Sequence, residues 1–414
     1  MHILIAATGS YGDVYPFVGL GRALKARGHE VELCTNEHFR HSAEAEGLGF
    51  VPAGSAEFYE ETIRNPDLWH PTRGIRIVFG TVARYLPLGY KVLSRHYRKG
   101  ETLLVASTLA LGARVLQETT GGKLVSVHLA PNVFRSDEDA IQSVKGPVLA
   151  RAPKWVRRCA WWLADRVAID PMIAPALNEF RGQFGLAPVR RVFRDWIHSP
   201  DRVIGLFPDW FAPKRPGWPE QTRLVGFPLY DAAAHEPLPD DLECFLGAGD
   251  APVLFAPGSA NTTAREFFAT SLAACERAAR RAVFVSRYGN QIPVELPVWA
   301  RHFDYLPFSQ VLPRCSAFVS HGGIGSVSQG FRAGVPQIIR AMGFDQFENG
   351  WRAEQLGVAK LLPARRYTVD TVVQALTELA SAACTRACRH VAERFSREDA
   401  LEVTAGIIES VAAS

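Results

Sequence analysis

The sequence predicts an α/β protein made of two Rossmann-like domains. At 414 residues the chain is long for one domain and sufficient for two. It opens with an apolar run at 2–7, a helical pattern at 15–27 and a second apolar run at 30–35, which is the order of a parallel β-α-β unit. A second strand-like start follows at 252–256. We therefore expect one parallel sheet in each half of the chain.

Composition narrows the classes of protein that the chain fits. Hydrophobic residues make up 47%, enough for two large cores, and a formal net charge of +4 is too small to indicate nucleic acid binding. The seven cysteines are scattered without a CxxC pair, so neither a zinc site nor a disulfide framework is expected. We expect no signal peptide and no membrane span, since no apolar run approaches about 20 residues. A reducing, cytoplasmic protein is the expectation.

The rest of the N-terminal half continues the alternation of strands and helices. The stretch 56–97 is less regular and fits either a substrate pocket or a helical hairpin with an aromatic core. The polar stretch 128–139 is expected to be a loop that forms one wall of such a pocket. The expected regular elements are strands at 48–52, 101–107, 123–128 and 202–207, and a helix at 110–119.

A basic segment rich in tryptophan lies at 153–166. Trp155, Trp161 and Trp162 are interspersed there with four Lys and Arg residues. A helix of this composition can rest on an anionic membrane surface. The plain alternative is a helix with one face in the core and a solvated basic face.

The second half of the chain follows a proline-rich linker. Residues 214–238 contain no long periodic segment, so they are expected to join a first domain, 1–228, to a second domain, 229–396. After the strand at 252–256, the second domain is expected to continue with a helix at 266–280 and a strand at 282–286.

The strongest indication of a ligand site follows an apolar run at 317–320. His321 comes next, with three glycines among the following four residues, and then a helical pattern at 326–333. A glycine-rich turn at a helix N-terminus presents unpaired N–H groups and the positive end of the helix dipole, which suits a phosphate or diphosphate. His321 and Ser326 can add donors. The alternative is an ordinary turn in which His321 is a satisfied polar residue.

A second polar turn is expected beside the first. The apolar run 337–341 leads to Asp345 and Gln346. Because the carboxyl ends of parallel strands meet at one edge of a sheet, both turns are expected at that edge. A carboxylate next to a carboxamide can hydrogen-bond the hydroxyls of a sugar ring. Together, a diphosphate seat and a sugar clamp indicate a nucleotide-sugar site.

Residues 305–349 resemble, without a gap, the donor-binding signature of nucleotide-sugar glycosyltransferases with two Rossmann-like domains, the GT-B fold. The resemblance implies two parallel sheets that face each other across a cleft. It also implies an acceptor-binding first domain, a donor-binding second domain and a last helix, about 397–414, that returns to the first. The implied donor contacts are Tyr305 stacked on the pyrimidine, the backbone of Leu306 at its edge, Ser259, His321, Gly323, Gly325 and Ser326 at the diphosphate, and Asp345 and Gln346 at the hexose. For Ser259 the alternative is a plain turn serine.

One position departs from the uridine-diphosphate members of that family. Where they usually have a glutamate that holds the ribose hydroxyls, this chain has Gln329. A neutral amide binds a diol less strongly than a carboxylate does. The change favours a deoxyribose donor such as a dTDP-sugar.

The candidate base is Asp13, at the carboxyl end of the first strand. A carboxylate there can accept the proton of an attacking hydroxyl, provided that partial burial raises its pKa above about 4. The alternative is a cap on the following helix. Residues 9–20 resemble the N-terminal loop of the same glycosyltransferases, whose bacterial antibiotic and lipid members use an aspartate here as the base; Gly12 is grouped with the donor contacts. The glycine spacing does not fit a dinucleotide-binding fingerprint.

Residues 109–114, 195–213 and 224–229 are similar to the rhamnosyltransferases of bacterial rhamnolipid synthesis. This narrower resemblance implies dTDP-L-rhamnose as co-substrate, a hydrophobic 3-(3-hydroxyalkanoyloxy)alkanoic acid as acceptor, and the enzyme that supplies this acyl dimer as a partner at the inner membrane. The implied reaction is inverting and needs no metal or cofactor. A UDP- or dTDP-sugar transferase acting on a polyketide, sterol or flavonoid is the alternative. Two further hypotheses are that the chain is an inactive homologue or an epimerase.

Overall fold

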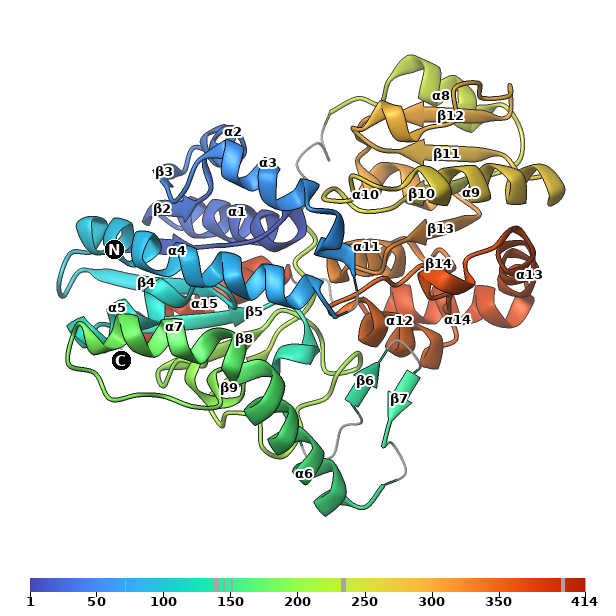
Figure 1. The fold of residues 1–414 in the computed structure, drawn as a ribbon. Helices are drawn as coiled ribbons and strands as arrows, with labels where there is room; N and C mark the ends of the chain where they lie inside the picture. The colour runs from blue at the N-terminus through green and yellow to red at the C-terminus, as the bar shows by residue number, and fades with distance from the viewer. Residues whose placement is uncertain are drawn as a thin grey trace. The chain divides into compact units, whose positions relative to one another are not determined.

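The computed structural model of this chain describes residues 1–70, 72–136, 141–143, 146–149, 152–231, 236–395 and 399–413. The chain forms two compact units (Figure 1): unit 1 consists of Met1–Leu68, Thr72–Tyr230 and Arg397–Ser414, and unit 2 of Trp69–Pro71 and Asp231–Ser396. Each unit has its own parallel sheet with helices packed on it, which confirms the predicted α/β fold class. Parts of four predicted segments lie outside the described residues: 71 of the stretch 56–97, 137–139 of the loop, 232–235 of the linker, and 397–398 and 414 of the last helix.

Unit 1 is built on a seven-stranded sheet in the order β3-β2-β1-β4-β5-β8-β9, with every neighbouring pair parallel. The central strands are apolar along their length because both faces are covered, and all five residues of β1 are buried. β9 was not predicted, because its sequence TRL forms no apolar run. The strands are β1 (His2–Ala6), β2 (Glu30–Thr35), β3 (Gly49–Pro52), β4 (Thr102–Ser107), β5 (Leu124–His128), β8 (Arg202–Gly205) and β9 (Thr222–Leu224).

Unit 2 has a six-stranded parallel sheet in the order β12-β11-β10-β13-β14-β15. Phe255, Phe284 and Phe318 are fully buried on its strands. The strands are β10 (Val253–Ala256), β11 (Ala282–Val285), β12 (Ala300–Phe303), β13 (Ala317–Ser320), β14 (Gln337–Ile339) and β15 (Ala359–Leu361). The helices are α8 (Asp240–Gly247), α9 (Arg265–Arg277), α10 (Phe308–Val311), α11 (Ile324–Ala333), α12 (Gln346–Gln355), α13 (Val369–Leu379) and α14 (Ala382–Glu393).

The strand orders create one topological switch point in each unit. β1 lies between β2 and β4, and β10 lies between β11 and β13, so the sheet grows in opposite directions from each of these strands. Ligands of parallel α/β sheets bind outside the carboxyl ends of the strands at such switch points. The loops after β1 and β4 in unit 1, and after β10 and β13 in unit 2, are therefore where a site is expected.

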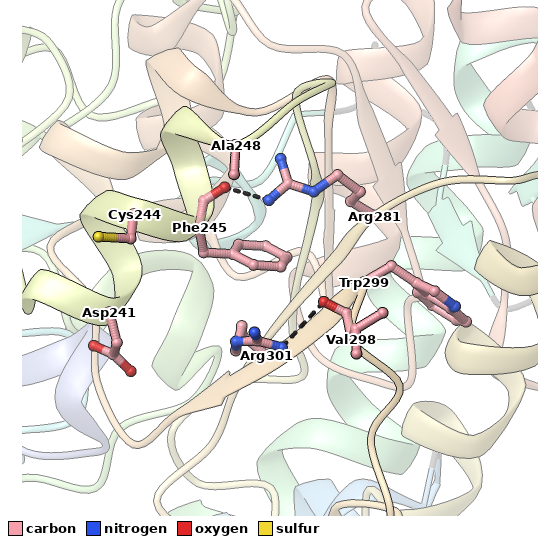
Figure 2. Close-up of a pocket in the computed structure, with 8 residues that line it drawn as sticks. All are labelled: Asp241, Cys244, Phe245, Ala248, Arg281, Val298, Trp299 and Arg301. Carbon is pink, nitrogen blue, oxygen red and sulfur yellow. Dashed lines mark hydrogen bonds between the residues drawn. The ribbon is translucent and has the colours of Figure 1, made fainter.

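A hollow of about 520 Å³ lies at the opposite, amino edge of the unit 2 sheet (Figure 2). Arg281 directly precedes β11, and Trp299 directly precedes β12. The guanidinium carbons of Arg281 and Arg301 lie 4.0 and 5.1 Å from the centre of the Phe245 ring, so these side chains are engaged in packing. None of the predicted site residues lines this hollow.

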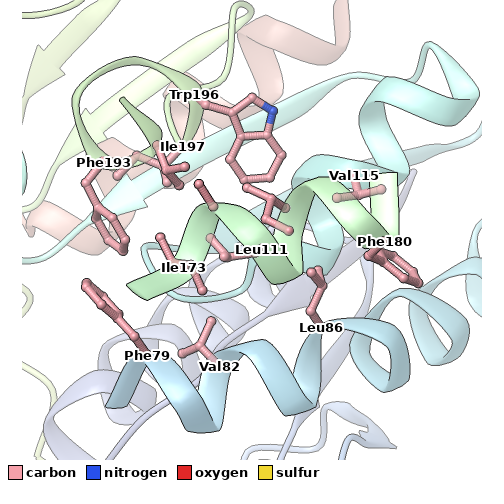
Figure 3. Close-up of a cluster of buried hydrophobic side chains, with 13 residues drawn as sticks. Phe79, Val82, Leu86, Leu111, Val115, Ile173, Phe180, Phe193, Trp196 and Ile197 are labelled. Atoms are coloured by element: carbon pink, nitrogen blue, oxygen red, sulfur yellow. The ribbon is translucent and has the colours of Figure 1, made fainter. Parts of the chain in front are cut away.

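The stretch 56–97, which was predicted to be less regular, is mostly helical, as the hairpin alternative required. Phe79, Val82 and Leu86 recur at helical spacing on α4 and pack against α5 and α7 (Figure 3). Phe79 stacks on Phe193 with ring centroids 4.9 Å apart. The helices of unit 1 are α1 (Tyr11–Ala26), α2 (Arg40–Ala45), α3 (Ala56–Arg64), α4 (Gly74–His96), α5 (Leu111–Thr120), α6 (Lys154–Ala164), α7 (Asp170–Gly182) and α15 (Ala400–Ala413).

The last helix, α15, packs against α1 and completes unit 1. Arg27 on the chain after α1 donates two hydrogen bonds to the Glu409 carboxylate, at 2.9 and 2.6 Å. The Lys123 ammonium donates to the Val411 carbonyl at 2.9 Å. Within the described residues, no helix combines the length and the apolar character that crossing a bilayer requires.

Candidate active site

Asp13 lies in the first turn of α1, which begins at Tyr11 rather than at the predicted residue 15. The helix starts early because Asp13 Oδ2 accepts hydrogen bonds from the Ser10 N–H at 2.8 Å and from the Ser10 hydroxyl at 2.9 Å. The capping role considered as an alternative is therefore present. It occupies one carboxylate oxygen only: Oδ1 accepts no hydrogen bond from the described residues, and the side chain is partly exposed.

The surroundings of Asp13 favour proton uptake. Burial raises the pKa of the Asp13 carboxyl above its usual value, although the two hydrogen bonds from Ser10 act against the rise. A higher pKa makes the carboxylate a better proton acceptor. Gly9 permits this packing, because its φ is 140° and a Cβ added there would lie 2.4 Å from Asp13 Oδ2.

Other polar side chains at the carboxyl edge of unit 1 were not predicted. Ser107, at the end of β4, accepts a hydrogen bond from the Thr8 N–H at 3.1 Å. The Tyr11 hydroxyl lies 2.8 Å from His38 Nε2, and Glu60 lies 3.8 Å from His38 Nδ1. These contacts join residues from 22 to 99 positions apart, so no local spacing in the sequence indicated them.

In unit 2 the candidate donor residues follow four different strands at one edge of the sheet. Ser259 follows β10, Tyr305 follows β12, His321 follows β13 and Asp345 follows β14. Since all these strands are parallel, each of the four residues emerges at the carboxyl edge. The edge predicted from the sequence is therefore the edge at which the structure gathers these residues.

Two glycine loops enclose the ring of His321. A Cβ added at Gly258 would lie 2.8 Å from His321 Nδ1, and one added at Gly323 would lie 2.6 Å from His321 Nε2. Gly258 and Gly322 have φ values of 99° and 92°, which favour glycine. The loops after β10 and β13 thus meet at His321, and exposed Ser259 lies next to Gly258.

Burial lowers the pKa of His321 to about 4, so the ring is neutral near pH 7. Its Nδ1 is buried without a partner among the described residues. The following helix, α11, begins at Ile324, two residues before the predicted start, with Gly323 at its cap position. Gly325 and Ser326 therefore lie in its first turn, where backbone N–H groups have no partner within the helix. Gln329 lies one turn further along and is partly exposed.

Asn349 joins the glycine turn to the acidic turn. Its side-chain amide donates to the Gly322 carbonyl at 3.0 Å and to Asp345 Oδ2 at 2.7 Å. The Asp345 carboxylate is thereby held beside the start of α11. Gln346 is buried, and its Oε1 accepts the N–H groups of Met342 at 2.8 Å and Gly343 at 3.2 Å, which leaves its amide nitrogen for a ligand. Asn349 lies in the predicted segment but was assigned no role.

Tyr305 and Leu306 differ in solvent exposure. The Tyr305 side chain is 50% exposed, and its hydroxyl donates to Asp231 Oδ1 at 2.9 Å. Asp231 Oδ2 also accepts from the Ser309 N–H at 3.0 Å, which fixes the turn. Leu306 is buried in the core, so only its backbone can meet a base. Gly12 is exposed on α1 of unit 1, beside Asp13, and its donor role stays a prediction.

Trp69 was missed by sequence reasoning as a member of this edge. It belongs to unit 2, where its indole N–H donates to the Ala260 carbonyl at 3.3 Å. The ring packs edge-on against His321 and Phe344, with centroids 6.3 and 5.8 Å away. Phe344 has a φ of 55° and is 42% exposed. Because Trp69 lies far from these residues in the sequence, only the fold reveals the contact.

Two models of known protein families match separate parts of the chain. The model of the glycosyltransferase family 28 N-terminal domain matches residues 3–119, and the model of the erythromycin biosynthesis protein CIII-like C-terminal domain matches residues 285–409. The chain is 29% identical to O-mycaminosyltylonolide 6-deoxyallosyltransferase of Streptomyces fradiae, over 99% of this chain and 97% of that protein.

Two solved structures share the fold. The kitacinnamycin glycotransferase gives a TM-score of 0.74 at 21% identity, over 99% of this chain and 98% of that one. The spinosyn rhamnosyltransferase SpnG complexed with thymidine diphosphate gives 0.67 at 18% identity, over 99% and 100%. These two likenesses show the GT-B fold. The two family-model matches identify the chain as a nucleotide-sugar glycosyltransferase, with a family 28 type segment at 3–119 and an EryCIII-like segment at 285–409.

Proposed function

We propose that the chain transfers a 6-deoxyhexose, L-rhamnose in the narrowest form of the proposal, from a dTDP-sugar to a hydroxyl of a hydrophobic acceptor, with inversion and without a metal. Unit 1 binds the acceptor and unit 2 binds the donor. The observation on which this rests is the bridge through Asn349, because it holds an acidic side chain beside a helix N-terminus and a neutral histidine. That combination supplies groups for a sugar and for its diphosphate at one edge of one sheet.

The donor half of the reaction follows from the electrostatics of unit 2. As the bond between the anomeric carbon and the diphosphate breaks, negative charge builds up on the diphosphate. The N–H groups in the first turn of α11 and the dipole of that helix stabilise this charge. A His321 N–H adds a hydrogen bond without the cost of a second buried charge. Groups placed in advance stabilise the transition state more than the ground state.

The acceptor half depends on Asp13. Its Oδ1 takes the proton from the acceptor hydroxyl while the hydroxyl oxygen attacks the anomeric carbon on the face opposite the diphosphate. The carbon–oxygen bond to the diphosphate breaks in the same step, so the configuration inverts. The Ser10 hydrogen bonds fix the other oxygen, which orients the carboxylate before the substrate arrives.

Two observations support a dTDP-6-deoxyhexose donor. Gln329 replaces the glutamate that holds the ribose diol in uridine-diphosphate enzymes. The Streptomyces fradiae relative is named for 6-deoxyallosyl transfer, and the SpnG structure is that of a rhamnosyltransferase with thymidine diphosphate. For the acceptor, the segments similar to rhamnolipid rhamnosyltransferases favour a 3-(3-hydroxyalkanoyloxy)alkanoic acid. The name O-mycaminosyltylonolide in the 29% identical relative favours a polyketide aglycone as the second candidate.

A lipidic acceptor would fit the exposed apolar side chains of α6. Trp155, Trp162 and Leu163 are 69%, 55% and 54% exposed, and basic residues lie beside them. We propose that this helix rests on the anionic cytoplasmic surface of the inner membrane, where the enzyme that supplies an acyl dimer would release it. Flotation with phosphatidylglycerol vesicles tests this contact. Binding should weaken for Trp155→Ala with Trp162→Ala, and equal binding by wild type and variant would contradict it.

A two-stage assay tests the proposed function. Thermal shift with dTDP and UDP comes first, and a nucleotide that binds the folded state should raise the midpoint. Mass spectrometry then follows sugar transfer from dTDP-L-rhamnose to an acyl dimer and to a macrolide aglycone. A shift with dTDP and a rhamnosylated product support the proposal. A shift with UDP alone, or dTDP-sugar conversion without an acceptor, would contradict it.

A further inference from the structure

Two buried histidines behind the carboxyl edge of unit 1 form a hydrogen-bonded chain that ends at Thr108. His128 Nδ1 lies 2.9 Å from Thr108 Oγ1, and His128 Nε2 lies 3.0 Å from His198 Nδ1. Both histidines are buried. The Phe134 ring stacks on His198 at an angle of 11°, and Trp218 stacks on Phe134 in turn. The two imidazoles are therefore held in fixed positions.

The donor and acceptor roles along these hydrogen bonds follow from the one histidine nitrogen that has no partner. Burial lowers the pKa of His198 to about 4 and that of His128 well below its usual value, so each ring is neutral and has one N–H. His198 Nε2 is buried and has no partner in the described part of the chain. Buried N–H groups without an acceptor are rarer than buried acceptors without a donor. The unpaired Nε2 is therefore the lone-pair nitrogen.

This assignment fixes the remaining hydrogens. If His198 has its hydrogen on Nδ1, it donates to His128 Nε2, and His128 then has its own hydrogen on Nδ1 and donates to Thr108 Oγ1. The Thr108 oxygen is thereby an acceptor, and its hydroxyl hydrogen is not needed by the histidines. The hydroxyl hydrogen of Thr108 is therefore available to a group other than the two histidines.

Thr108 stands at the edge where Asp13 lies. β1 and β4 are neighbours in register at Ala6 and Ala106, so Thr8 and Thr108 each lie two residues beyond a paired position. The Thr8 N–H bonds the Ser107 hydroxyl, which ties the loop before Asp13 to the residue before Thr108. The Thr108 side chain is partly exposed. Its free hydroxyl hydrogen therefore lies at the same sheet edge as the open oxygen of Asp13.

We propose that Thr108 donates a hydrogen bond to an oxygen of the acceptor, and that His128 and His198 are positioning residues that keep the Thr108 hydroxyl in its donor role. The ligand group is an uncharged or anionic oxygen, such as a carbonyl, ether, carboxylate or second hydroxyl near the reacting one. This assignment rests on the proposed function. It adds a second acceptor contact beside the proton transfer to Asp13.

Kinetics on the full chain test the acceptor contact. One hydrogen bond contributes about 1 kcal/mol, so Thr108→Val should lower kcat/KM for the acceptor roughly five- to tenfold, with the donor KM and dTDP affinity unchanged. Thr108→Ser should restore the wild-type value. Thr120→Val is the matched control, because the Thr120 hydroxyl bonds the Leu116 carbonyl within α5. An equal loss in Thr108→Val and Thr120→Val, or a fall in dTDP affinity, would overturn the proposal.

The hydrogen positions can be read separately by 15N NMR of labelled histidine, with single variants assigning the two signals. We expect His128 and His198 both as Nδ1–H tautomers, and finding either as Nε2–H would overturn the inference. This readout does not require catalysis. Absence of sugar transfer by the wild type would remove the proposed function and the acceptor role together, whereas a wrong tautomer would remove this inference alone.

Discussion

Each unit places the side chain assigned to the reaction against a glycine loop at the carboxyl edge of its sheet, but the two side chains have opposite acid–base character. In each, a loop at the switch point contains a glycine with positive φ, Gly9 at 140° and Gly258 at 99°, and that glycine touches the side chain assigned to the reaction. In unit 1 burial raises the pKa of Asp13 and leaves a carboxylate oxygen open to take a proton. In unit 2 burial lowers the pKa of His321 and keeps it a neutral hydrogen-bonding group. Desolvation acts against charge in both places, and the residue type decides whether the result is a proton acceptor or a neutral donor.

The largest effect should come from Asp13→Asn. Asparagine can still accept from Ser10, so the fold should persist, but no base remains for the acceptor hydroxyl. We expect kcat to fall by about 10²–10⁴-fold with dTDP affinity unchanged. Steady-state kinetics and a matched Asp209→Asn control, at an exposed residue, measure this. If affinity fell as much as kcat, Asp13 would be a structural cap and the contrast between the units would fail.

His321→Ala should produce the next largest effect. It should weaken binding of the nucleotide-sugar donor rather than the reaction of the acceptor. Loss of a hydrogen bond to a charged phosphate oxygen weakens binding by about 1.5–3 kcal/mol, roughly ten- to a hundredfold. The donor KM should rise by that factor while the acceptor KM stays near the wild-type value. A rise in the acceptor KM alone would contradict the assignment of His321 to the donor.

The two glycines can be exchanged for alanine to test the loops themselves. Gly9→Ala should displace Asp13, and Gly258→Ala should displace His321, because each added Cβ would lie under 3 Å from those side chains. Each position also has a positive φ, which costs about 1–2 kcal/mol for alanine. Gly9→Ala should lower kcat, and Gly258→Ala should raise the donor KM. Gly80→Ala on α4, with nothing near its added Cβ, is the control and should leave both parameters unchanged.

The pH dependence of stability gives a smaller effect. His198 has a folded pKa of about 4 and an unfolded value near 6.5, so the unfolded state binds more protons between these values. Stability is therefore complete above pH 6.5 and falls as the pH drops toward 4, by about 2 kcal/mol at pH 5 from this residue. The thermal midpoint should decrease from pH 7 to pH 5, and less so in His198→Phe. An identical decrease in both proteins would rule out this origin.

The sequence was most informative where a single strand and the residues after it determine the geometry. The apolar run of β1, the glycines after β13 and the order of strands and helices predicted the fold class and the edge at which His321 and Asp345 lie. The helix starts were less accurate, because the Ser10–Asp13 cap extends α1 back to Tyr11 through side-chain bonds that propensity does not reveal.

Contacts over long sequence separations were beyond prediction. The chain from Thr108 through His128 to His198 joins residues 20 and 70 positions apart, and Trp69 reaches Ala260 across 191. No periodicity or motif links such residues. β9, β12 and β15 were also missed, because their short sequences TRL, ARHF and AKL contain charged residues and give no apolar run. Residue types at strand ends can therefore be predicted, but their partners are known only once the sheet is assembled.

Calorimetric titration of dTDP into the wild type, Asp13→Asn and His321→Ala tests most directly whether His321 binds the donor nucleotide while Asp13 acts only on the acceptor. Equal affinity for wild type and Asp13→Asn, with binding weakened at least tenfold in His321→Ala, is the predicted result. Lost binding in Asp13→Asn, or unchanged binding in His321→Ala, would contradict it.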